Sequence, residues 1–181
     1  MEFEYDVKEN EILLKRCYGT EERIEVPAQI EGMPVTVLAP YIFSQARREP
    51  DQKAAICGNQ VKEIVLPDTV REIGNYAFYG CYYLEALTLS HRTHDIAGGA
   101  FTGCRHLKNL TFRMEQAEGY CMKDVLSEVH HEMKVKLVYP NAVCTLLFPE
   151  YYEEAVENTP ARQLETQFHG SGYSYRQCFQ D

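Results

Sequence analysis

The chain has 181 residues, a formal net charge of −9 and 45% hydrophobic residues, which suits one domain or two small ones with a packed core. The acidic balance argues against nucleic acid or an anionic membrane as a partner, because either would require a basic face. No apolar run reaches the roughly 18–20 residues that span a bilayer, and the acidic, alternating N-terminus is unlike a signal peptide. We therefore expect a cytoplasmic protein, or a cell-surface or secreted one if a leader was removed.

The first predicted element is a β-hairpin. Hydrophobic residues alternate with polar ones from Phe3 to Val7 and again from Ile12 to Leu14, with Glu9-Asn10 between the two runs. Alternation of this kind predicts two antiparallel strands joined by a short turn. We expect this hairpin to cap the open N-terminal end of the fold that follows.

The middle of the chain repeats with a period of 23 residues: Leu84–His106 aligns with Val61–Tyr83 without a gap, and Leu107 opens a third copy. Such self-similarity predicts a solenoid, in which coils stack because none can bury its apolar face alone. We expect Leu66, Leu89 and Phe112 to hold equivalent inward positions on consecutive parallel strands. The identical pairs are Leu66/Leu89, Ile73/Ile96, Ala77/Ala100, Phe78/Phe101, Gly80/Gly103 and Cys81/Cys104.

Each coil reads as a strand of the pattern LxxLxL followed by a turn, a second core crossing and the step A-F-x-G-C. Pro67-Asp68 is predicted to end the first strand, since proline cannot donate to a ladder. Ala77-Phe78 is predicted to form a tight helical or 3₁₀ turn that places the Phe78 ring inside. Phe78 and Phe101 should therefore be buried in successive layers of one core.

A degenerate copy precedes these coils. Ile24–Pro27 matches Ile64–Pro67, and Leu38–Phe43 matches Ile73–Phe78, with an insertion at Gly32-Met33-Pro34 that predicts a turn. The polar segment Ser44–Gln60 is predicted to be a short helix or a loop between coils.

The segments EIVLPDTVREIGNYAFYGC, ALTLSHRTHDIAGGAFTGC and IEVPAQIEGMPVTVLAPYIF resemble the BspA-like class of leucine-rich repeat proteins of gut and oral bacteria. The resemblance covers roughly residues 3–113, and the A-F-x-G-C step is unlike other leucine-rich repeats. It implies a short leucine-rich-repeat solenoid, and a role as a surface or secreted module for adhesion and protein binding.

The period is lost after Arg113, so we divide the chain into a solenoid of residues 1–113 and a small α/β capping region of residues 114–181. The latter resembles no family, and its abrupt end suggests truncation. Its predicted elements are a helix Met122–Met133, strands Lys134–Tyr139 and Val143–Phe148, a helix Tyr151–Asn158, a turn Gln167–Tyr175 and a helix that starts within Tyr173–Gln180.

Seven cysteines, an odd number without any CxxC pair, indicate reduced thiols rather than a disulfide framework. Cys81 and Cys104 should stack in adjacent coils about 4.8 Å apart, whereas a disulfide requires Cβ atoms about 3.8 Å apart and converging. A zinc site would need two further ligands. We therefore expect all seven cysteines to be free and no metal to be bound.

No convergent catalytic set is visible, so we predict no catalytic residue and no cofactor. Gly170-Ser171-Gly172 lacks the surroundings of a phosphate loop or a nucleophile elbow. The paired acids Glu153-Glu154 are expected on a solvated helix face. The histidines are also predicted to be solvated, because adjacent side chains on a helix diverge and the turns of the coils face solvent; these are His91, His94, His106, His130 and His131.

The exposed strand positions favour a non-enzymatic module for protein interaction or scaffolding. Lys62, Glu85 and Lys108 should stack in one column, with Thr88 and Thr111 in another, and solenoids usually bind partners on this surface. The partner is predicted to be a protein, neither nucleic acid nor membrane, and the oligomeric state is left open. Tyrosines offer a second contact surface, or else bury the end of the solenoid; they are Tyr82-Tyr83, Tyr151-Tyr152 and Tyr173–Tyr175.

Two alternatives remain at this stage. The chain is a fragment or subunit whose activity lies beyond residue 181, or it is an enzyme with its site in the C-terminal region.

Overall fold

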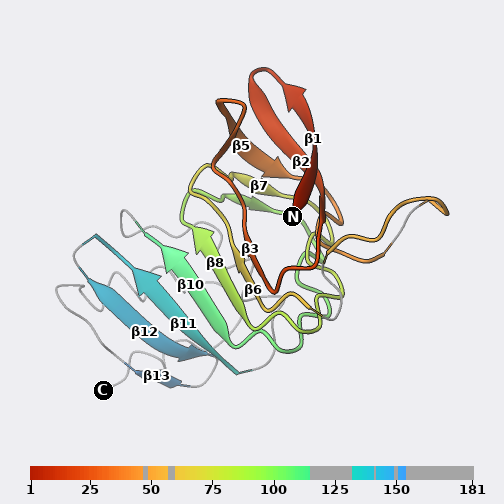
Figure 1. Ribbon diagram of the computed structural model, residues 1–181. Coiled ribbons are helices and arrows are strands. Elements are labelled where there is room, and N and C mark those ends of the chain that lie inside the picture. The colour runs from red at the N-terminus through yellow and green to blue at the C-terminus, as the bar shows by residue number, and fades with distance from the viewer. Residues whose placement is uncertain (47–48, 57–59, 115–131, 141, 149–150, 154–181) are drawn as a thin grey trace.

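The protein is described by a computed structural model over residues 1–46, 49–56, 60–114, 132–140, 142–148 and 151–153. These residues contain strands and turns but no helix, so no helix in them is long and apolar enough to cross a membrane. The strands form two sheets, one of seven strands and one of six. Figure 1 shows the large sheet running from β13 to β3, with the β1–β2 hairpin at the opposite end of the view.

The large sheet has the strand order β13-β12-β11-β10-β8-β6-β3. Its pairs are parallel from β3 to β11, and antiparallel from β11 to β13. The strands are β3 (Arg23–Glu25), β6 (Glu63–Val65), β8 (Ala86–Ser90), β10 (Asn109–Arg113), β11 (Met133–Val138), β12 (Val143–Phe148) and β13 (Tyr151–Glu153).

The second sheet has the order β1-β2-β5-β7-β9, and β4 pairs with β5 beside this path. The chain passes from the large sheet to the second sheet after β3, after β6 and after β8. Strands β3, β6, β8 and β10 mark about four turns of a parallel solenoid. The strands are β1 (Glu2–Lys8), β2 (Glu11–Tyr18), β4 (Gln29–Ile30), β5 (Met33–Leu38), β7 (Glu72–Ile73) and β9 (Asp95–Ile96).

The strand register confirms the 23-residue period. Leu89 pairs with Phe112, and the Leu66 amide donates to the Thr88 carbonyl at 3.0 Å, so the three inward positions lie on consecutive parallel strands. All three side chains are fully buried. Strand β6 ends at Val65, so Leu66 directly follows the strand and directly precedes the predicted stop at Pro67-Asp68.

The N-terminal hairpin is confirmed in both strands and turn. Glu9 and Asn10 have φ values of 52° and 64°, and Lys8 pairs with Glu11 across them. Positive φ at both central residues is the mark of a type I′ turn, whose twist matches that of the flanking strands. Because β2 pairs with β5, the hairpin extends the second sheet, while β3 ends the large one.

The degenerate first coil is also confirmed. Ile24 pairs with Ile64, Leu38 pairs with Ile73, and the predicted insertion turns at Glu31-Gly32 between β4 and β5. The described residues of Ser44–Gln60 contain no helix and form an excursion, drawn in orange in Figure 1, that stands away from the stack.

A ladder of buried phenylalanine rings runs through the core. The Phe43 and Phe78 ring centroids are 5.2 Å apart, and those of Phe78 and Phe101 are 5.1 Å apart with ring planes at 9°. All three rings are at most 2% exposed, which confirms the prediction of successive layers. The turn that carries Phe78 is tight, since the Cys81 amide donates to the Phe78 carbonyl at 3.0 Å, but it extends into no helix.

The C-terminal region departs from its predicted helices. The predicted helix Tyr151–Asn158 is wrong at its start, because Tyr151–Glu153 is strand β13, paired with β12. Tyrosine favours strands, and the ladder that β12 offers outweighs the Pro-Glu signal for a helix start. Met133 belongs to β11 rather than to the predicted helix Met122–Met133, while β12 has the predicted bounds. Residues 122–131, 154–158 and 167–180 of the predicted elements lie outside the described residues.

Candidate functional site

The predicted columns of exposed residues exist on the large sheet. At the strand entries, the Glu85 amide donates to the Lys62 carbonyl at 2.8 Å and the Lys108 amide to the Glu85 carbonyl at 2.9 Å, and all three side chains are exposed. Further along the strands, Thr88 pairs with Thr111. The structure therefore places Lys62, Glu85 and Lys108 at the entries of three consecutive strands, and Thr88 and Thr111 at the centres of two of them. The three charged side chains make no ion pair with one another.

Charges on this face are compensated near β3 and β6. Arg23 lies 2.8 Å from the Glu25 carboxylate and 3.0 Å from that of Glu63, and Lys62 lies 3.0 Å from Glu22. These contacts raise the pKa of the Arg23 guanidinium, chiefly through the hydrogen bond to Glu25 and the charge of Glu63. Exposed pairs of this kind contribute little stability, so their main effect is to neutralise this part of the face.

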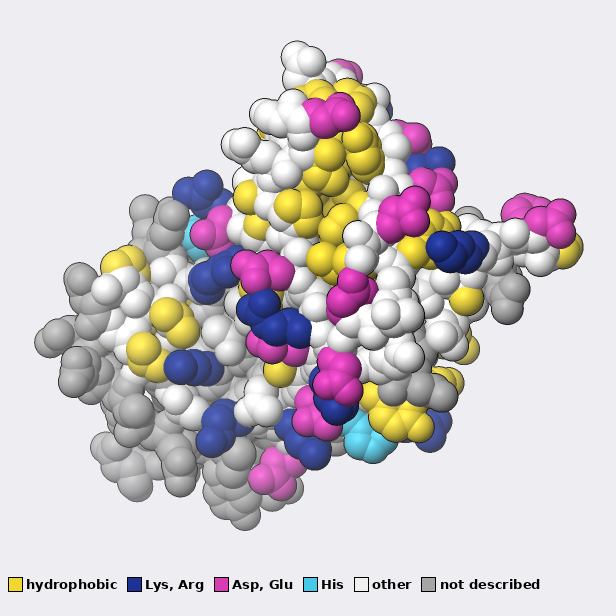
Figure 2. All heavy atoms as spheres, in the orientation of Figure 1, with side chains coloured by type: hydrophobic (Ala, Val, Ile, Leu, Met, Phe, Trp, Pro, Cys, Tyr) yellow, Lys and Arg dark blue, Asp and Glu magenta, His cyan; other side chains and the backbone are white. Residues whose placement is uncertain are grey.

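The rest of the face changes from neutral to cationic. In the register of the sheet, Asn109 lies between Ala86 and Lys134, and Thr111 lies beside Lys136. Both lysines of β11 are exposed and form no ion pair with any described residue. Figure 2 shows dark blue Lys and Arg side chains over this part of the sheet, with magenta Asp and Glu gathered toward β3, β6 and the hairpin.

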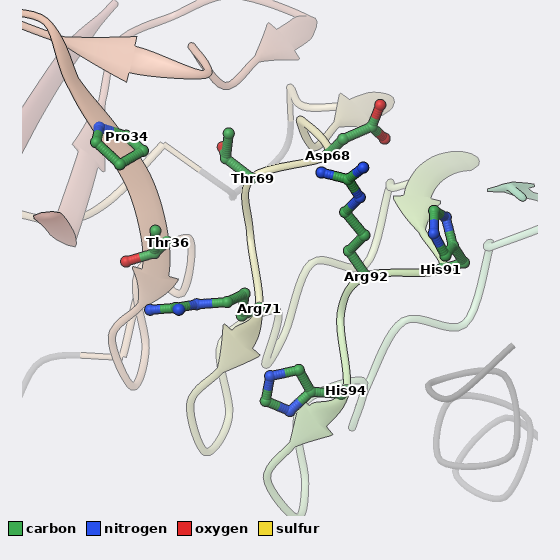
Figure 3. Close-up of a pocket in the computed structure, with 8 residues that line it drawn as sticks. All are labelled: Pro34, Thr36, Asp68, Thr69, Arg71, His91, Arg92 and His94. Atoms are coloured by element: carbon green, nitrogen blue, oxygen red, sulfur yellow. The ribbon is translucent and has the colours of Figure 1, made fainter. Parts of the chain in front are cut away.

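A groove of about 610 Å³ lies where the coils turn from the large sheet to the second sheet. Figure 3 shows that its walls carry stacked residues from three coils, because the Arg71 amide donates to the Thr36 carbonyl and the His94 amide to the Arg71 carbonyl. Arg71 lies 2.5 Å from the Glu11 carboxylate, so its charge is compensated. The lining residues are Pro34, Thr36, Asp68, Thr69, Arg71, His91, Arg92 and His94.

The groove modifies the prediction for the histidines. His94 is exposed as expected, but His91 is partly buried, and its Nδ1 lies 3.0 Å from the Arg113 carbonyl oxygen. His106 stacks on Tyr83 with ring centroids 6.0 Å apart. The described residues contain no group of His, Cys, Asp or Glu arranged to hold a metal ion. His130-His131 and Gly170-Ser171-Gly172 lie outside the described residues.

The cysteine prediction is wrong in one respect. Cys81 is disulfide-bonded, whereas Cys17 and Cys104 carry thiols, so not all seven cysteines are free. The partner of Cys81 is therefore not Cys104, which agrees with the poor geometry expected of that stacked pair. The Cys104 thiol instead donates to the Phe78 carbonyl at 3.3 Å. An odd cysteine count does not prevent a single bridge, because the unpaired cysteines can remain as buried thiols.

Two features of the hairpin were not predicted. Arg16, on β2, is only 4% exposed although it is charged, and the Cys17 thiol beside it is fully buried. Burial raises the pKa of Cys17 to about 12, with a smaller contribution from Glu21. Burial also raises the pKa of Tyr18, followed by its hydrogen bond to Glu4. Side chains alternate between the two faces of the strand EILLKRCY, and Arg16 falls on the same inward face as Ile12 and Leu14. This alternation was the sequence feature that could have predicted the burial of Arg16.

The solved structures that the chain resembles are repeat proteins of bacteria. A T. pallidum leucine rich repeat protein is 24% identical with a TM-score of 0.51, over 62% of this chain and 51% of that chain. A leucine rich cell surface protein from Faecalibacterium prausnitzii is 20% identical with a TM-score of 0.44, over 77% of this chain and 41% of that chain. The chain thus spans about half the length of the former and less of the latter. No curated protein matches the sequence.

A family model described as BspA type leucine rich repeat region, in six copies, matches residues 52–142. This match takes in the regular coils and every strand of the large sheet from β6 to β11. Because it covers half of the chain and agrees with the fold, the chain belongs to the BspA-type leucine-rich repeat family.

Proposed function

We propose that the chain is a non-enzymatic module that binds a protein through the exposed face of its large sheet. The observation that carries this proposal is the composition of the face along β8, β10 and β11. Small neutral side chains lie at its centre, and Lys134 and Lys136 lie at one end without ionic partners among the described residues. A partner can approach small side chains closely, and unpaired charge at one end of a face sets the orientation of a complementary partner.

The experiment is a pull-down from the source cell, followed by affinity measurement with the captured, purified protein. A face variant replaces Lys62, Glu85 and Lys108 with Ala. Its matched control replaces Lys8, Glu9 and Arg105 with Ala, which removes the same charges from exposed positions elsewhere. We expect the face variant alone to lose affinity, by about tenfold for 1.4 kcal/mol of lost contacts. Equal binding by both variants would show that the face is only structural.

We also propose that the protein works in an oxidising compartment, at the cell surface or in a secreted form. The disulfide at Cys81 supports this, since disulfides persist outside the reducing cytoplasm. The earlier expectation of a cytoplasmic protein has no support. Titration of the denatured, non-reduced protein should find at most five reactive thiols of the seven cysteines. Seven reactive thiols would remove the argument.

A further inference from the structure

The open edge of β1 is the longest unpaired strand edge in the described part of the chain. β1 has seven residues and pairs only with β2, whereas the other strands that end a sheet, β3, β4, β9 and β13, have two or three. The register of the hairpin shifts between Glu4 and Tyr5, where Lys15 of β2 is the extra residue, so β1 itself stays regular. Unpaired backbone groups on a regular edge are a template for a further strand.

The backbone groups that face this edge are those of Phe3, Tyr5 and Val7. Lys8 and Glu11 flank the two-residue turn and pair with each other, so the Lys8 N–H and C=O groups point toward β2. Successive residues of a strand direct these groups to opposite sides, which leaves the three alternate residues facing the open edge. Among the described residues, no backbone hydrogen bond reaches them from outside the hairpin.

The side chains of the same three residues form an apolar row that the core covers only in part. The second sheet continues past β5 through β2 and β1, whereas the large sheet ends at β3 of the same coil. Ile12 on β2 is fully buried, but its partner Val7 on β1 is 51% exposed, and Phe3 and Tyr5 are half-buried against the core. Figure 2 shows yellow hydrophobic side chains gathered over the region where Figure 1 draws the hairpin and β5. The row is therefore open to the apolar side chains of one further strand.

The two ends of β1 carry opposite charges that lack ionic partners. Glu2 and Lys8 are exposed, and neither forms an ion pair with any described residue. An antiparallel pair of β1 strands with a two-fold axis at Tyr5 places Glu2 of each copy opposite Lys8 of the other. A uniformly basic or uniformly acidic strand of another protein satisfies only one of these ends. The charge pattern is therefore complementary to itself.

We propose that β1 pairs antiparallel with β1 of a second copy of this chain, about a two-fold axis at Tyr5. Phe3 of each copy then lies opposite Val7 of the other, and the two Tyr5 rings meet at the axis, which covers the apolar row. The three facing pairs exchange about six main-chain hydrogen bonds, two in each pair. This surface is distinct from the large-sheet face, so the dimer carries two such faces and is bivalent for any partner of that face.

The carboxylates at the centre of β1 are compensated within each copy. Glu4 lies opposite Asp6 of the second copy in this pairing. Lys15 Nζ lies 3.5 Å from Glu4 and 3.6 Å from Asp6 of its own copy, and the Arg16 guanidinium lines a small cavity together with Glu4. Each copy therefore brings two positive charges for its two central carboxylates, and the charges at the ends of β1 decide the attraction.

The test is sedimentation velocity of the full chain over a concentration series, with a non-reducing gel that detects disulfide-linked dimers. We expect a reversible, non-covalent dimer with a Kd between about 1 μM and 1 mM, because a single strand pair is a small interface. A chain that stays monomeric at about 1 mM overturns the proposal and leaves the edge to a strand of another protein. A dimer that the gel shows to be covalent overturns it in favour of a cysteine link.

An exchange of charges tests the register. Lys8→Glu should raise the Kd of the dimer at least about tenfold, because two opposite-charge pairs become like-charge pairs. The double variant Glu2→Lys with Lys8→Glu restores both pairs, so it should return the Kd to that of the wild type. Arg105→Glu makes the same change of charge at an exposed position of a later coil and should leave the Kd unchanged. An unchanged Kd in Lys8→Glu, or a double variant no tighter than the single one, overturns the assigned pairing.

Val7→Pro tests the backbone contact. Proline removes a donor that faces the open edge but none that bonds to β2, and edge strands tolerate proline there. We expect a monomer whose circular dichroism matches the wild type, and a folded variant that still dimerises as tightly overturns the proposal. If Val7→Pro does not fold, the exchange of charges decides alone. Affinity for the large-sheet face is compared below the Kd of the dimer, where every variant is monomeric, so the two proposals fail independently.

Discussion

The regular coils and the first coil are built on the same plan but differ in what they leave on the surface. From Val61 to Phe112 each coil repeats its predecessor, and the inward positions fill one continuous core. The first coil keeps the same core positions, at Ile24, Leu38 and Phe43, but carries an insertion, an excursion and a hairpin. The buried Arg16 lies on the hairpin strand β2. The regular repeats thus build the continuous core, whereas the interrupted first coil places a charged side chain inside the protein.

The largest expected loss of stability comes from substitutions in the phenylalanine ladder. Phe78 lies between two rings, at 5.2 and 5.1 Å, whereas Phe43 contacts one ring of the ladder. Phe78→Ala should cost toward the upper end of about 3–5 kcal/mol, and Phe43→Ala toward the lower end. Chemical denaturation measures both. Equal losses would mean that the first coil is as tightly coupled to the core as the regular ones, and a midpoint that hardly moves for Phe78→Ala would contradict the ladder itself.

A smaller effect is expected where the first coil meets the second. A Cβ atom on Gly74 would lie 2.5 Å from the Pro40 nitrogen and 2.9 Å from the Ala39 carbonyl carbon, both of them backbone. Because backbone cannot move aside easily, Gly74→Ala should destabilise the protein by about 1–3 kcal/mol. Gly98→Ala is the control, since nothing lies within 4 Å of its Cβ position. The two melting temperatures should differ; identical values would show that the junction is loose.

The smallest effect on stability near neutral pH is expected from Cys17 on the hairpin strand β2, because the thiol keeps its proton there in both the folded and the unfolded state. The Cys17 pKa is about 12 in the folded protein, against an ordinary 9.0. The folded state therefore retains the proton that the unfolded state loses, and stability should fall as pH rises from 9 toward 12, by about 1.4 kcal/mol per unit. Cys17→Ala should show a shallower decline over this range. Parallel curves for the two proteins in urea denaturation would indicate that Cys17 ionises freely in the folded state.

Sequence alone predicted the coil register, because a fixed period leaves one way to align apolar positions on parallel strands. It also predicted the hairpin turn, since Glu9-Asn10 interrupts two alternating runs. The sequence-based prediction failed at Tyr151–Glu153, where the strand forms because β12 offers a pairing partner. Strand pairing is a tertiary contact, which the local sequence does not contain. The burial of Arg16 was missed for the same reason, because its guanidinium donates to the Tyr41 and Lys53 carbonyls only when the hairpin packs on the first coil.

The contacts between coils also bear on the length of this protein. Each coil offers the next the same backbone donors and acceptors, so a copy of 23 residues could be inserted or removed without changing the hydrogen-bonding pattern. The position in each coil held by Tyr41, Tyr76 and Gly99 is not interchangeable in this way. The Tyr76 ring fills the space that a Cβ of Gly99 would occupy, at 2.4 Å from its Cε1, whereas Tyr41 and Tyr76 stack side by side. The choice of tyrosine or glycine at this step decides where the exposed aromatic row ends, independently of how many coils the solenoid has.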